Sequence, residues 1–419
     1  MIPRFRRRPR FHREWLRVAS LGLVLAASAP ADGPQKPVLA TTPPADIALP
    51  RGWTESAPPA STKAFAPMLA ADGDAVLATW LEPLSSGGHR VRFARWRAAT
   101  WGAATTVREA TTLFANWADV PGVVRAPDRS LYAWWLEKSG ADTYAYDARL
   151  ARSTDDGASF RPLGPLHEDR SEVEHGFVAA APESAGVRFF YLDGRATANG
   201  APMQLRSVYV EGDGIGASEI VDDAVCDCSS TAAAAIPAGT AIAYRDRTAA
   251  EIRDIRLAIR PHEGALFNRA VGDDGWRIDG CPVNGPALAA RGRNLAVAWF
   301  TAPGDRARIR TAISLDGGRS LGPPRTIDAA QPLGRLSLAT LPDGFAVAWL
   351  ARLQEGAELR VARLDEGGVV NRRSTVARTL EGRGAGIPRL AATADRLALA
   401  WIDIRGEGLR FATTPLRPR

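Results

Sequence analysis

A short apolar strand that ends in an aromatic residue recurs along the chain. Each copy contains β-branched, aromatic and small residues and is bounded by Gly, Asp or Pro, which is the pattern of a β-strand. The copies follow one another every 50 to 56 residues, so the chain is built from a repeated unit. Their final aromatic residues are Trp80, Trp135, Tyr191, Tyr244, Trp299, Trp349 and Trp401.

A later strand of every unit, which follows the aromatic strand, supports the count of seven. It carries an arginine two places before a small apolar residue. A shorter apolar run precedes the first strand, and a fourth strand follows, as at residues 325–328. Four strands per unit, repeated around an axis, are typical of β-propeller blades. We therefore predict an all-β propeller of four-stranded blades, with seven blades favoured and six as the alternative. The arginines are Arg92, Arg149, Arg206, Arg256, Arg310, Arg360 and Arg410.

The end of the chain predicts how the ring of blades closes. The last unit stops seven residues after Ala412, which leaves no room for its fourth strand. We expect a segment near Ile47 to Thr54 to complete this blade, because pairing the two ends leaves no open strand edge. The propeller would then span residues 65–419, with the aromatic strand ends in the core between blades.

Residues 1–31 have the pattern of a signal peptide. Arginines come first, an apolar run follows at residues 18–27, and Ala29-Pro30-Ala31 offers a cleavage site. The run is too short to span a bilayer, which needs about 20 residues. Residues 32–64 are rich in Pro, Ala and Thr and are predicted to be a linker that includes the possible closing strand. We expect an exported protein, periplasmic or extracellular, without a membrane span.

The formal net charge of +7 does not predict a nucleic-acid partner. The seven arginines and one glutamate of residues 1–31 contribute +6 of it, which leaves +1 for the rest of the chain. A nucleic-acid-binding domain carries its basic surface on the folded body. We expect a monomer that does not bind nucleic acid.

Two units carry the pattern Ser-x-Asp-x-Gly-x-x-aromatic between their third and fourth strands. In such a turn the aspartate accepts hydrogen bonds from backbone N–H groups, and the glycine supplies a positive φ. With these motifs the chain resembles the Asp-box (BNR-repeat) sialidase-like β-propeller superfamily over about residues 66–419. The motifs are Ser153, Asp155, Gly157 and Phe160, and then Ser314, Asp316, Gly318 and Leu321.

The resemblance implies a glycan-binding or glycoside-hydrolysing protein. Sialidases bind the substrate carboxylate with an arginine triad, use a Tyr–Glu pair as nucleophile and use an Asp as acid/base. They also carry an early Phe-Arg-Ile-Pro motif and six blades. No such string occurs here, and we count seven units. A propeller without glycosidase activity therefore remains an alternative.

Propeller topology places two sets of loops on one face, around the central mouth. These are the loops that lead into the innermost strand of each blade and the loops between the second and third strands. Arginines there would suit an anionic or polyhydroxyl ligand, because the guanidinium fork binds carboxylates. Asp–Arg pairs that merely join neighbouring blades are the alternative. The candidate acid/base residues are Asp246 and Asp193, the candidate nucleophiles Tyr144 and Tyr146, and the candidate ligand contacts Arg195, Arg245, Arg247, Asn116, Trp117 and Asn284.

The three cysteines of the chain suggest a second function. Cys226 and Cys228 lie in the loop that enters the fourth unit, Cys281 in the loop that enters the fifth, and His175 in the loop that enters the third. If these loops meet at the axis, the four side chains could bind copper or zinc. In an exported protein a disulfide between Cys281 and Cys226 or Cys228 is the alternative. The second hypothesis is thus a non-catalytic envelope propeller that binds a soft metal or a protein partner.

Overall fold

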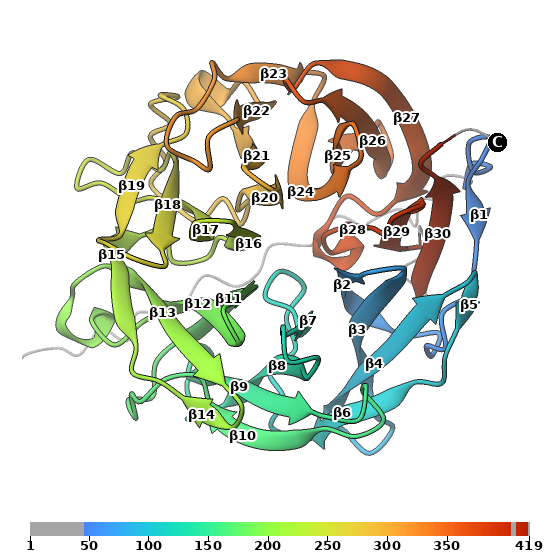
Figure 1. The fold of residues 1–419 in the computed structure, drawn as a ribbon. Helices are drawn as coiled ribbons and strands as arrows, with labels where there is room; N and C mark the ends of the chain where they lie inside the picture. Colours follow the sequence, from blue (N-terminus) through green and yellow to red (C-terminus); the bar gives the residue numbers. More distant parts are fainter. Residues whose placement is uncertain (1–45, 404–407, 418–419) are drawn as a thin grey trace, which may run out of the picture. The chain divides into compact units, whose positions relative to one another are not determined.

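The structure is a computed structural model that describes residues 46–403 and 408–417. These residues form seven antiparallel sheets around a central axis (Figure 1). The prediction of an all-β propeller with seven blades is confirmed. The predicted signal peptide and the linker up to residue 45 lie outside the described residues. Among the described residues, no helix has the length and apolarity needed to cross a bilayer.

Every blade has an innermost, a second, a third and an outer strand, and we number the blades 1 to 7 by their innermost strands. The innermost strands are β2 (Phe65–Asp72), β7 (Gly122–Arg125), β11 (His175–Glu183), β16 (Ala232–Ile236), β20 (Ala287–Arg291), β24 (Pro332–Leu341) and β28 (Arg389–Ala392). The second strands are β3 (Ala75–Pro83), β8 (Leu131–Lys138), β12 (Gly186–Asp193), β17 (Gly239–Arg245), β21 (Asn294–Thr301), β25 (Gly344–Arg352) and β29 (Arg396–Ile402).

The third strands are β4 (His89–Arg97), β9 (Tyr146–Ser153), β13 (Met203–Glu211), β18 (Ile255–Pro261), β22 (Arg308–Ser314), β26 (Ala357–Asp365) and β30 (Leu409–Pro415). The outer strands are β6 (Thr105–Ala110), β10 (Arg161–Pro165), β15 (Glu219–Val225), β19 (Phe267–Ala270), β23 (Arg325–Asp328), β27 (Val370–Thr379) and β1 (Thr54–Glu55). The short strands β5 (Thr100–Trp101) and β14 (Gly214–Ile215) pair antiparallel with the ends of β4 and β13. Three short 3-10 turns are η1 (Thr197–Asn199), η2 (Pro303–Asp305) and η3 (Arg383–Ala385).

An N-terminal strand closes the last blade, as predicted. Strand β1 pairs with β30, with Thr54 opposite Thr413 and Glu55 opposite Ala412. The predicted segment ended at Thr54, so the closing strand lies further along the chain than expected. Trp53 packs against the apolar core between blades 6 and 7 and anchors this strand.

The aromatic residue of each second strand lies directly opposite the arginine of the third strand. Trp349 is fully buried in an apolar cluster that contains residues of blades 5 and 6. Its indole Nε1 donates to Asp328 Oδ2 at 2.6 Å, and Arg360 Nη1 donates to the same oxygen at 2.9 Å. A buried indole N–H needs such an acceptor. The pairs are Trp80–Arg92, Trp135–Arg149, Tyr191–Arg206, Tyr244–Arg256, Trp299–Arg310, Trp349–Arg360 and Trp401–Arg410.

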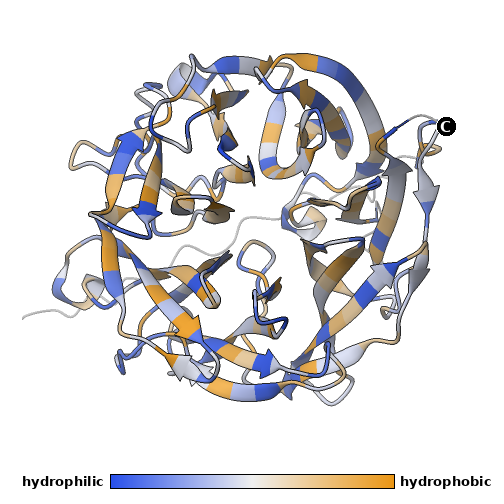
Figure 2. Ribbon diagram, in the orientation of Figure 1, coloured by the Kyte–Doolittle hydropathy of each residue, from blue (hydrophilic) through white to orange (hydrophobic). Residues whose placement is uncertain are grey.

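Burial differs between the second and third strands. Strand β12 is buried at every position, because neighbouring blades cover both of its faces. Strand β13 alternates between buried and partly exposed residues over most of its length, the pattern of a sheet with one face toward water. Figure 2 shows this alternation as hydrophobic and hydrophilic bands along the peripheral strands.

The turn that carries Ser153 and Asp155 is stabilised by its own side chains. Asp155 Oδ1 accepts hydrogen bonds from Ser153 Oγ at 2.7 Å and from the backbone N–H of Ser159 at 2.9 Å. Gly157 has φ +90°, and a Cβ there would lie 2.1 Å from the ring of Phe93 in blade 1. This turn therefore packs against the preceding blade, and only glycine fits at its closest point.

Candidate functional site

Loops from five blades meet in one apolar cluster around the axis. This result agrees with the expectation that segments far apart in the sequence share one rim. The cluster includes Trp117 and Ala118 from blade 2, Phe177 from blade 3, Cys228 from blade 4, Val283 from blade 5 and Ile387 from blade 7.

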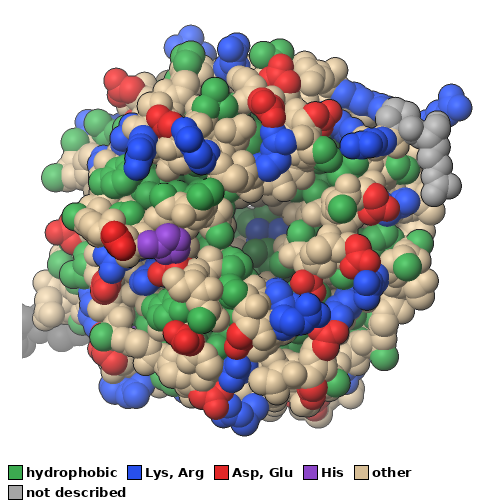
Figure 3. Space-filling view, in the orientation of Figure 1, with side chains coloured by type: hydrophobic (Ala, Val, Ile, Leu, Met, Phe, Trp, Pro, Cys, Tyr) green, Lys and Arg blue, Asp and Glu red, His purple; other side chains and the backbone are tan. Residues whose placement is uncertain are grey.

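A cavity of about 230 Å3 lies between the innermost strands. The space-filling view shows a hollow at the centre of the ring (Figure 3). Most of its lining is aliphatic, and Arg389 at the start of β28 is the charged residue that lines it. Burial lowers the pKa of Arg389 to about 10, which still leaves the side chain positively charged at neutral pH.

Two carboxyl groups and a tyrosine lie together between blades 2 and 3. Tyr146, the first residue of β9, donates a hydrogen bond from its hydroxyl to Glu174 Oε1 at 2.6 Å. The same hydroxyl lies 3.4 Å from Asp119 Oδ2. Asp119 Oδ2 also accepts the backbone N–H of Phe177 at 2.7 Å. We call Asp119, Tyr146 and Glu174 the acid–base group.

The acid–base group can hold and release protons near neutral pH. Burial raises the pKa of Asp119 to about 8, against the lowering effect of its hydrogen bond from Phe177. Burial also raises the pKa of Glu174 to about 7. The pKa of Tyr146 is raised well above its usual value by burial and by the two neighbouring carboxylates. Such shifts are typical of functional sites, although structural networks produce them as well.

The ligand contacts predicted around the mouth mostly hold neighbouring loops in place. Arg245 is buried and donates to the backbone carbonyls of Asn284, Arg253 and Phe300 at 2.6 to 3.1 Å. Asn284 bonds to blade 6 through the backbone N–H of Arg335 and the carbonyl of Leu333. These contacts occupy the donors that a substrate carboxylate would need.

Two further predicted contacts lie at the start of blade 2. Asn116 Oδ1 accepts the backbone N–H of Ala118 at 2.8 Å and so shapes the loop. The guanidinium of Arg335 lies over the Trp117 ring, 4.7 Å from its centroid. Trp117 is partly exposed at the rim.

The other predicted acid/base residues and arginines are engaged in ion pairs. Asp193 is buried and forms a bidentate pair with Arg195, which also binds Glu168. Arg247 binds Glu251 at 2.8 Å and Asp227 at 3.1 Å.

Asp246 and Tyr144 lie apart from the acid–base group. Asp246 Oδ1 accepts the backbone N–H of Arg247 at 2.9 Å, and Oδ2 lies 3.6 Å from Arg256 Nη1. Burial raises the pKa of Asp246. Tyr144 is exposed at the surface. Of the four predicted catalytic residues, Tyr146 is the one that the structure brings beside a Glu and an Asp.

The three cysteines meet where the loops into β16 and β20 come together. The side chain of Cys228 lies beside both Cys226 and Cys281, close enough for their thiols to interact. Cys226 Sγ also lies 3.4 Å from Arg253 Nη1. The neighbouring Cys228 thiol lowers the pKa of the Cys226 thiol. We call these residues the thiol cluster; all three are free thiols, and the alternative disulfide is not formed in this structure.

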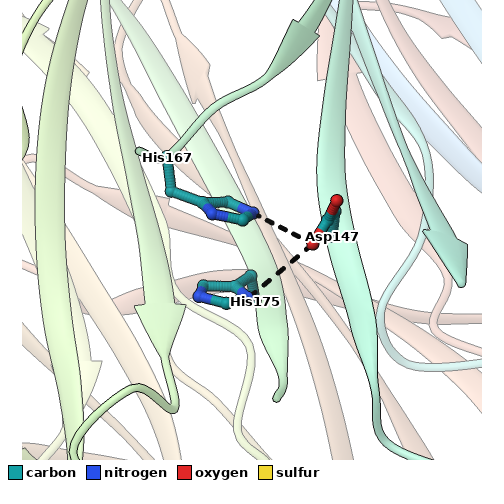
Figure 4. A group of neighbouring side chains, drawn as sticks. All are labelled: Asp147, His167 and His175. Atoms are coloured by element: carbon teal, nitrogen blue, oxygen red, sulfur yellow. Dashed lines mark ion pairs between the residues drawn. The ribbon is translucent and has the colours of Figure 1, made fainter. Parts of the chain in front are cut away.

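The structure does not place His175 in the thiol cluster. His175 stacks on His167, with ring centroids 3.7 Å apart, and both rings face Asp147 (Figure 4). Sequence reasoning did not consider His167 or Asp147. The sequence did contain an indication of this group, because two of the five histidines, His167 and His175, lie eight residues apart on either side of the acidic stretch 168–174.

No model of a known protein family matches the chain, and no curated protein matches its sequence. Solved structures match its fold. A polysaccharide lyase, an ulvan lyase, is 10% identical with a TM-score of 0.50 over 88% of this chain and 95% of that chain. The Hadza microbial sialidase Hz136 is 13% identical with a TM-score of 0.49 over 78% of this chain and 74% of that chain. A protein of unknown function from Dyadobacter fermentans is 9% identical with a TM-score of 0.47, over 88% and 97%. The chain is therefore a seven-bladed β-propeller, and its fold is similar to that of the ulvan lyase.

Proposed function

We propose that this protein acts on acidic glycans, as an exported hydrolase that uses the acid–base group. The observation that carries the proposal is the hydrogen bond of 2.6 Å between Tyr146 and Glu174, beside Asp119. These are the residue types that a glycosidase with a tyrosine nucleophile requires. Arg389 provides a positive charge near Asp119.

Each member of the acid–base group has a defined role in the proposed reaction. Glu174 accepts the hydroxyl proton of Tyr146 as the phenolic oxygen bonds to the anomeric carbon. Asp119, protonated below pH of about 8, donates its proton to the departing glycosidic oxygen. In the second step water attacks the anomeric carbon and gives a proton to Asp119. The Tyr146 oxygen leaves and recovers its proton from Glu174.

Access to the acid–base group runs past Glu174. Tyr146 is buried, and its ring stacks on Phe114 with centroids 4.2 Å apart. Glu174 is the member of the group with a partly exposed side chain. The ulvan lyase of similar fold has been solved bound to a GlcA(1-4)Rha3S unit, which contains an acidic sugar. This ligand of the ulvan lyase supports the choice of acidic glycans for the first screen.

The test is turnover of fluorogenic glycosides of acidic sugars. We expect the wild-type protein to release the fluorophore from at least one member of the panel, and Tyr146→Phe to reduce kcat by about 100-fold or more. Tyr144→Phe is the matched control, because that exposed tyrosine lies two residues before Tyr146, in the loop that leads into β9; it should keep full activity. No turnover by the wild-type protein would argue against hydrolysis, and full activity of Tyr146→Phe would exclude this mechanism.

A second candidate function is binding of a soft metal ion by the thiol cluster. The specific observation is that Cys228 lies beside both Cys226 and Cys281, and that these three free thiols belong to loops of two blades. Thiolate ligands select Cu(I) and zinc. We expect about one Cu(I) per chain in competition with a copper chelator under reducing conditions, lost in Cys228→Ser and kept in Ser229→Ala. Equal Cu(I) binding by the wild-type protein and Cys228→Ser would contradict this function.

A further inference from the structure

A second polar group lies behind the acid–base group. Asp147 follows Tyr146 at the start of β9, and His175 follows Glu174 at the start of β11. Successive residues of a strand point to opposite sides. Asp147 and His175 are therefore directed away from the acid–base group, and His167 joins them from the segment between β10 and β11 (Figure 4).

The hydrogen bonds of the two histidines fix where their ring protons lie. His167 Nδ1 is 3.1 Å from the backbone carbonyl of Asp169, which can only accept, so Nδ1 carries the proton. His175 Nε2 is 3.1 Å from Asp169 Oδ2, so Nε2 carries the proton there. In the neutral rings this leaves lone pairs on His167 Nε2 and His175 Nδ1.

Both of these ring nitrogens lie near one carboxylate oxygen of Asp147. Both histidine side chains are fully buried, and within the described part of the chain His167 Nε2 and His175 Nδ1 have no hydrogen-bond partner. Asp147 Oδ1 lies 3.5 Å from the first and 4.0 Å from the second. Three acceptors that converge without a donor are unfavourable unless a cation lies between them.

The distances fit a shared cation better than direct hydrogen bonds. An N–H···O hydrogen bond spans about 2.7 to 3.2 Å, which is shorter than both separations. Ligands about 2.0 to 2.1 Å from a tetrahedral zinc ion lie about 3.4 Å from one another. The three atoms lie within 4.8 Å of one another, and shifts of the Asp147 side chain and of the two stacked rings would bring them to that spacing.

The surroundings have the features of a metal site's outer shell. Ligating histidines usually donate their second ring N–H to a carboxylate or a carbonyl, and Asp169 supplies one of each. The other oxygen of Asp147 forms an ion pair with Arg149 Nη2 at 3.2 Å, which helps to orient the carboxylate.

We propose that Asp147, His167 and His175 bind one divalent cation of the zinc class. Two imidazoles and one carboxylate are a common ligand set for such ions. The ion would connect blade 2, through Asp147, to the start of blade 3, through His175. It would thereby fix the strand starts that carry Tyr146 and Glu174. Because the site is buried, its role is structural.

The test measures metal directly and does not depend on glycan turnover. It uses a background in which Cys226, Cys228 and Cys281 are serine, so that the thiol cluster cannot contribute zinc. We expect about one zinc per chain by elemental analysis after dialysis, and at least tenfold weaker binding in His167→Gln. His262→Gln is the matched control, since that histidine is exposed and far in sequence from the site. A chelator should lower the Tm of the background protein and leave that of His167→Gln unchanged.

Two results would overturn the proposal. One is a background protein that takes up neither zinc nor cobalt and whose Tm does not respond to the chelator. The other is a His167→Gln protein that binds zinc as tightly as its parent. If His167→Gln does not fold, the visible spectrum of cobalt in the unmodified site decides. Tetrahedral Co2+ bands support the site, and the spectrum of free aqueous cobalt excludes it.

Discussion

Asp119 and Asn284 hold equivalent positions in blades 2 and 5. Each lies three residues before the innermost strand of its blade. Each accepts a hydrogen bond from a backbone N–H of the next blade, Asp119 from Phe177 at 2.7 Å and Asn284 from Arg335 at 2.8 Å. Phe177 and Arg335 both have positive φ at an irregularity of the innermost strand. Because an amide oxygen suffices in blade 5, the blade contact does not require the ionisable carboxyl of Asp119.

This equivalence allows the structural and chemical roles of Asp119 to be separated. We expect Asp119→Asn to keep the hydrogen bond to Phe177 and to fold with a Tm within a few degrees of the wild type. The variant cannot donate the proton that the proposed hydrolysis needs, so kcat should fall by about 100-fold, as is typical for loss of a general acid. Circular dichroism and turnover of the same preparation check both points. A folded variant with full activity would assign the acid elsewhere.

Asp119 also predicts a pH dependence of stability. Its pKa is about 8 in the folded protein and about 4 in an unfolded chain. The folded state therefore binds the extra proton between these values, and the wild-type free energy of unfolding falls as pH rises from about 4 to about 8. The asparagine of Asp119→Asn does not titrate, so the free energy of unfolding of this variant does not fall with pH for this reason. Its Tm relative to the wild type should be higher at pH 8 than at pH 5, whereas an equal difference at both pH values would show that Asp119 does not titrate in this range.

The Trp349–Arg360 pair predicts a difference between two arginines of blade 6. Arg360→Ala leaves the buried carboxylate of Asp328 without its cation, which should destabilise the protein by about 2 kcal/mol. Arg352→Ala is the control, because Arg352 forms an exposed pair with Glu381 worth less than about 1 kcal/mol. The urea midpoint of each variant measures the effect. Equal midpoints would mean that the repeated arginine does not stabilise the blade.

Arg245→Lys tests the structural role of the buried arginine. A lysine cannot reproduce the fork that binds three carbonyl groups, so at least one buried carbonyl would lose its donor, at a cost of about 1 to 3 kcal/mol. Arg247→Lys should have a smaller effect, because Arg247 is more exposed and pairs with flexible carboxylates. Thermal unfolding of both variants gives the comparison. A loss of turnover in Arg245→Lys without a change in Tm would restore its predicted role as a substrate clamp.

Removal of the closing strand should weaken the whole ring. A chain that begins at residue 57 lacks β1 and Trp53, and it exposes the edge of β30. We expect a lower Tm and more association than for a chain that begins at residue 46, since an open strand edge pairs with other molecules. Light scattering and calorimetry measure the two properties. Identical behaviour of the two chains would show that the β1–β30 pairing does not hold the propeller closed.

The sequence by itself determined the blade count and the pattern within each blade. An aromatic residue such as Trp349 and an arginine such as Arg360 recur in each of the seven units, and this is local information along the chain. The closing strand was placed too early, because a two-residue strand at Thr54–Glu55 has no periodicity to reveal it.

Only the tertiary structure decided which polar residues share a site. Tyr146 was recognisable as a candidate, but its partners Asp119 and Glu174 lie 27 and 28 residues away, on loops whose paths no local pattern defines. For the same reason His175 was assigned to the cysteines, although it faces Asp147 and His167. Strand patterns arise from neighbours along one chain segment, whereas the contacts of a site depend on how loops of different blades pack around the axis.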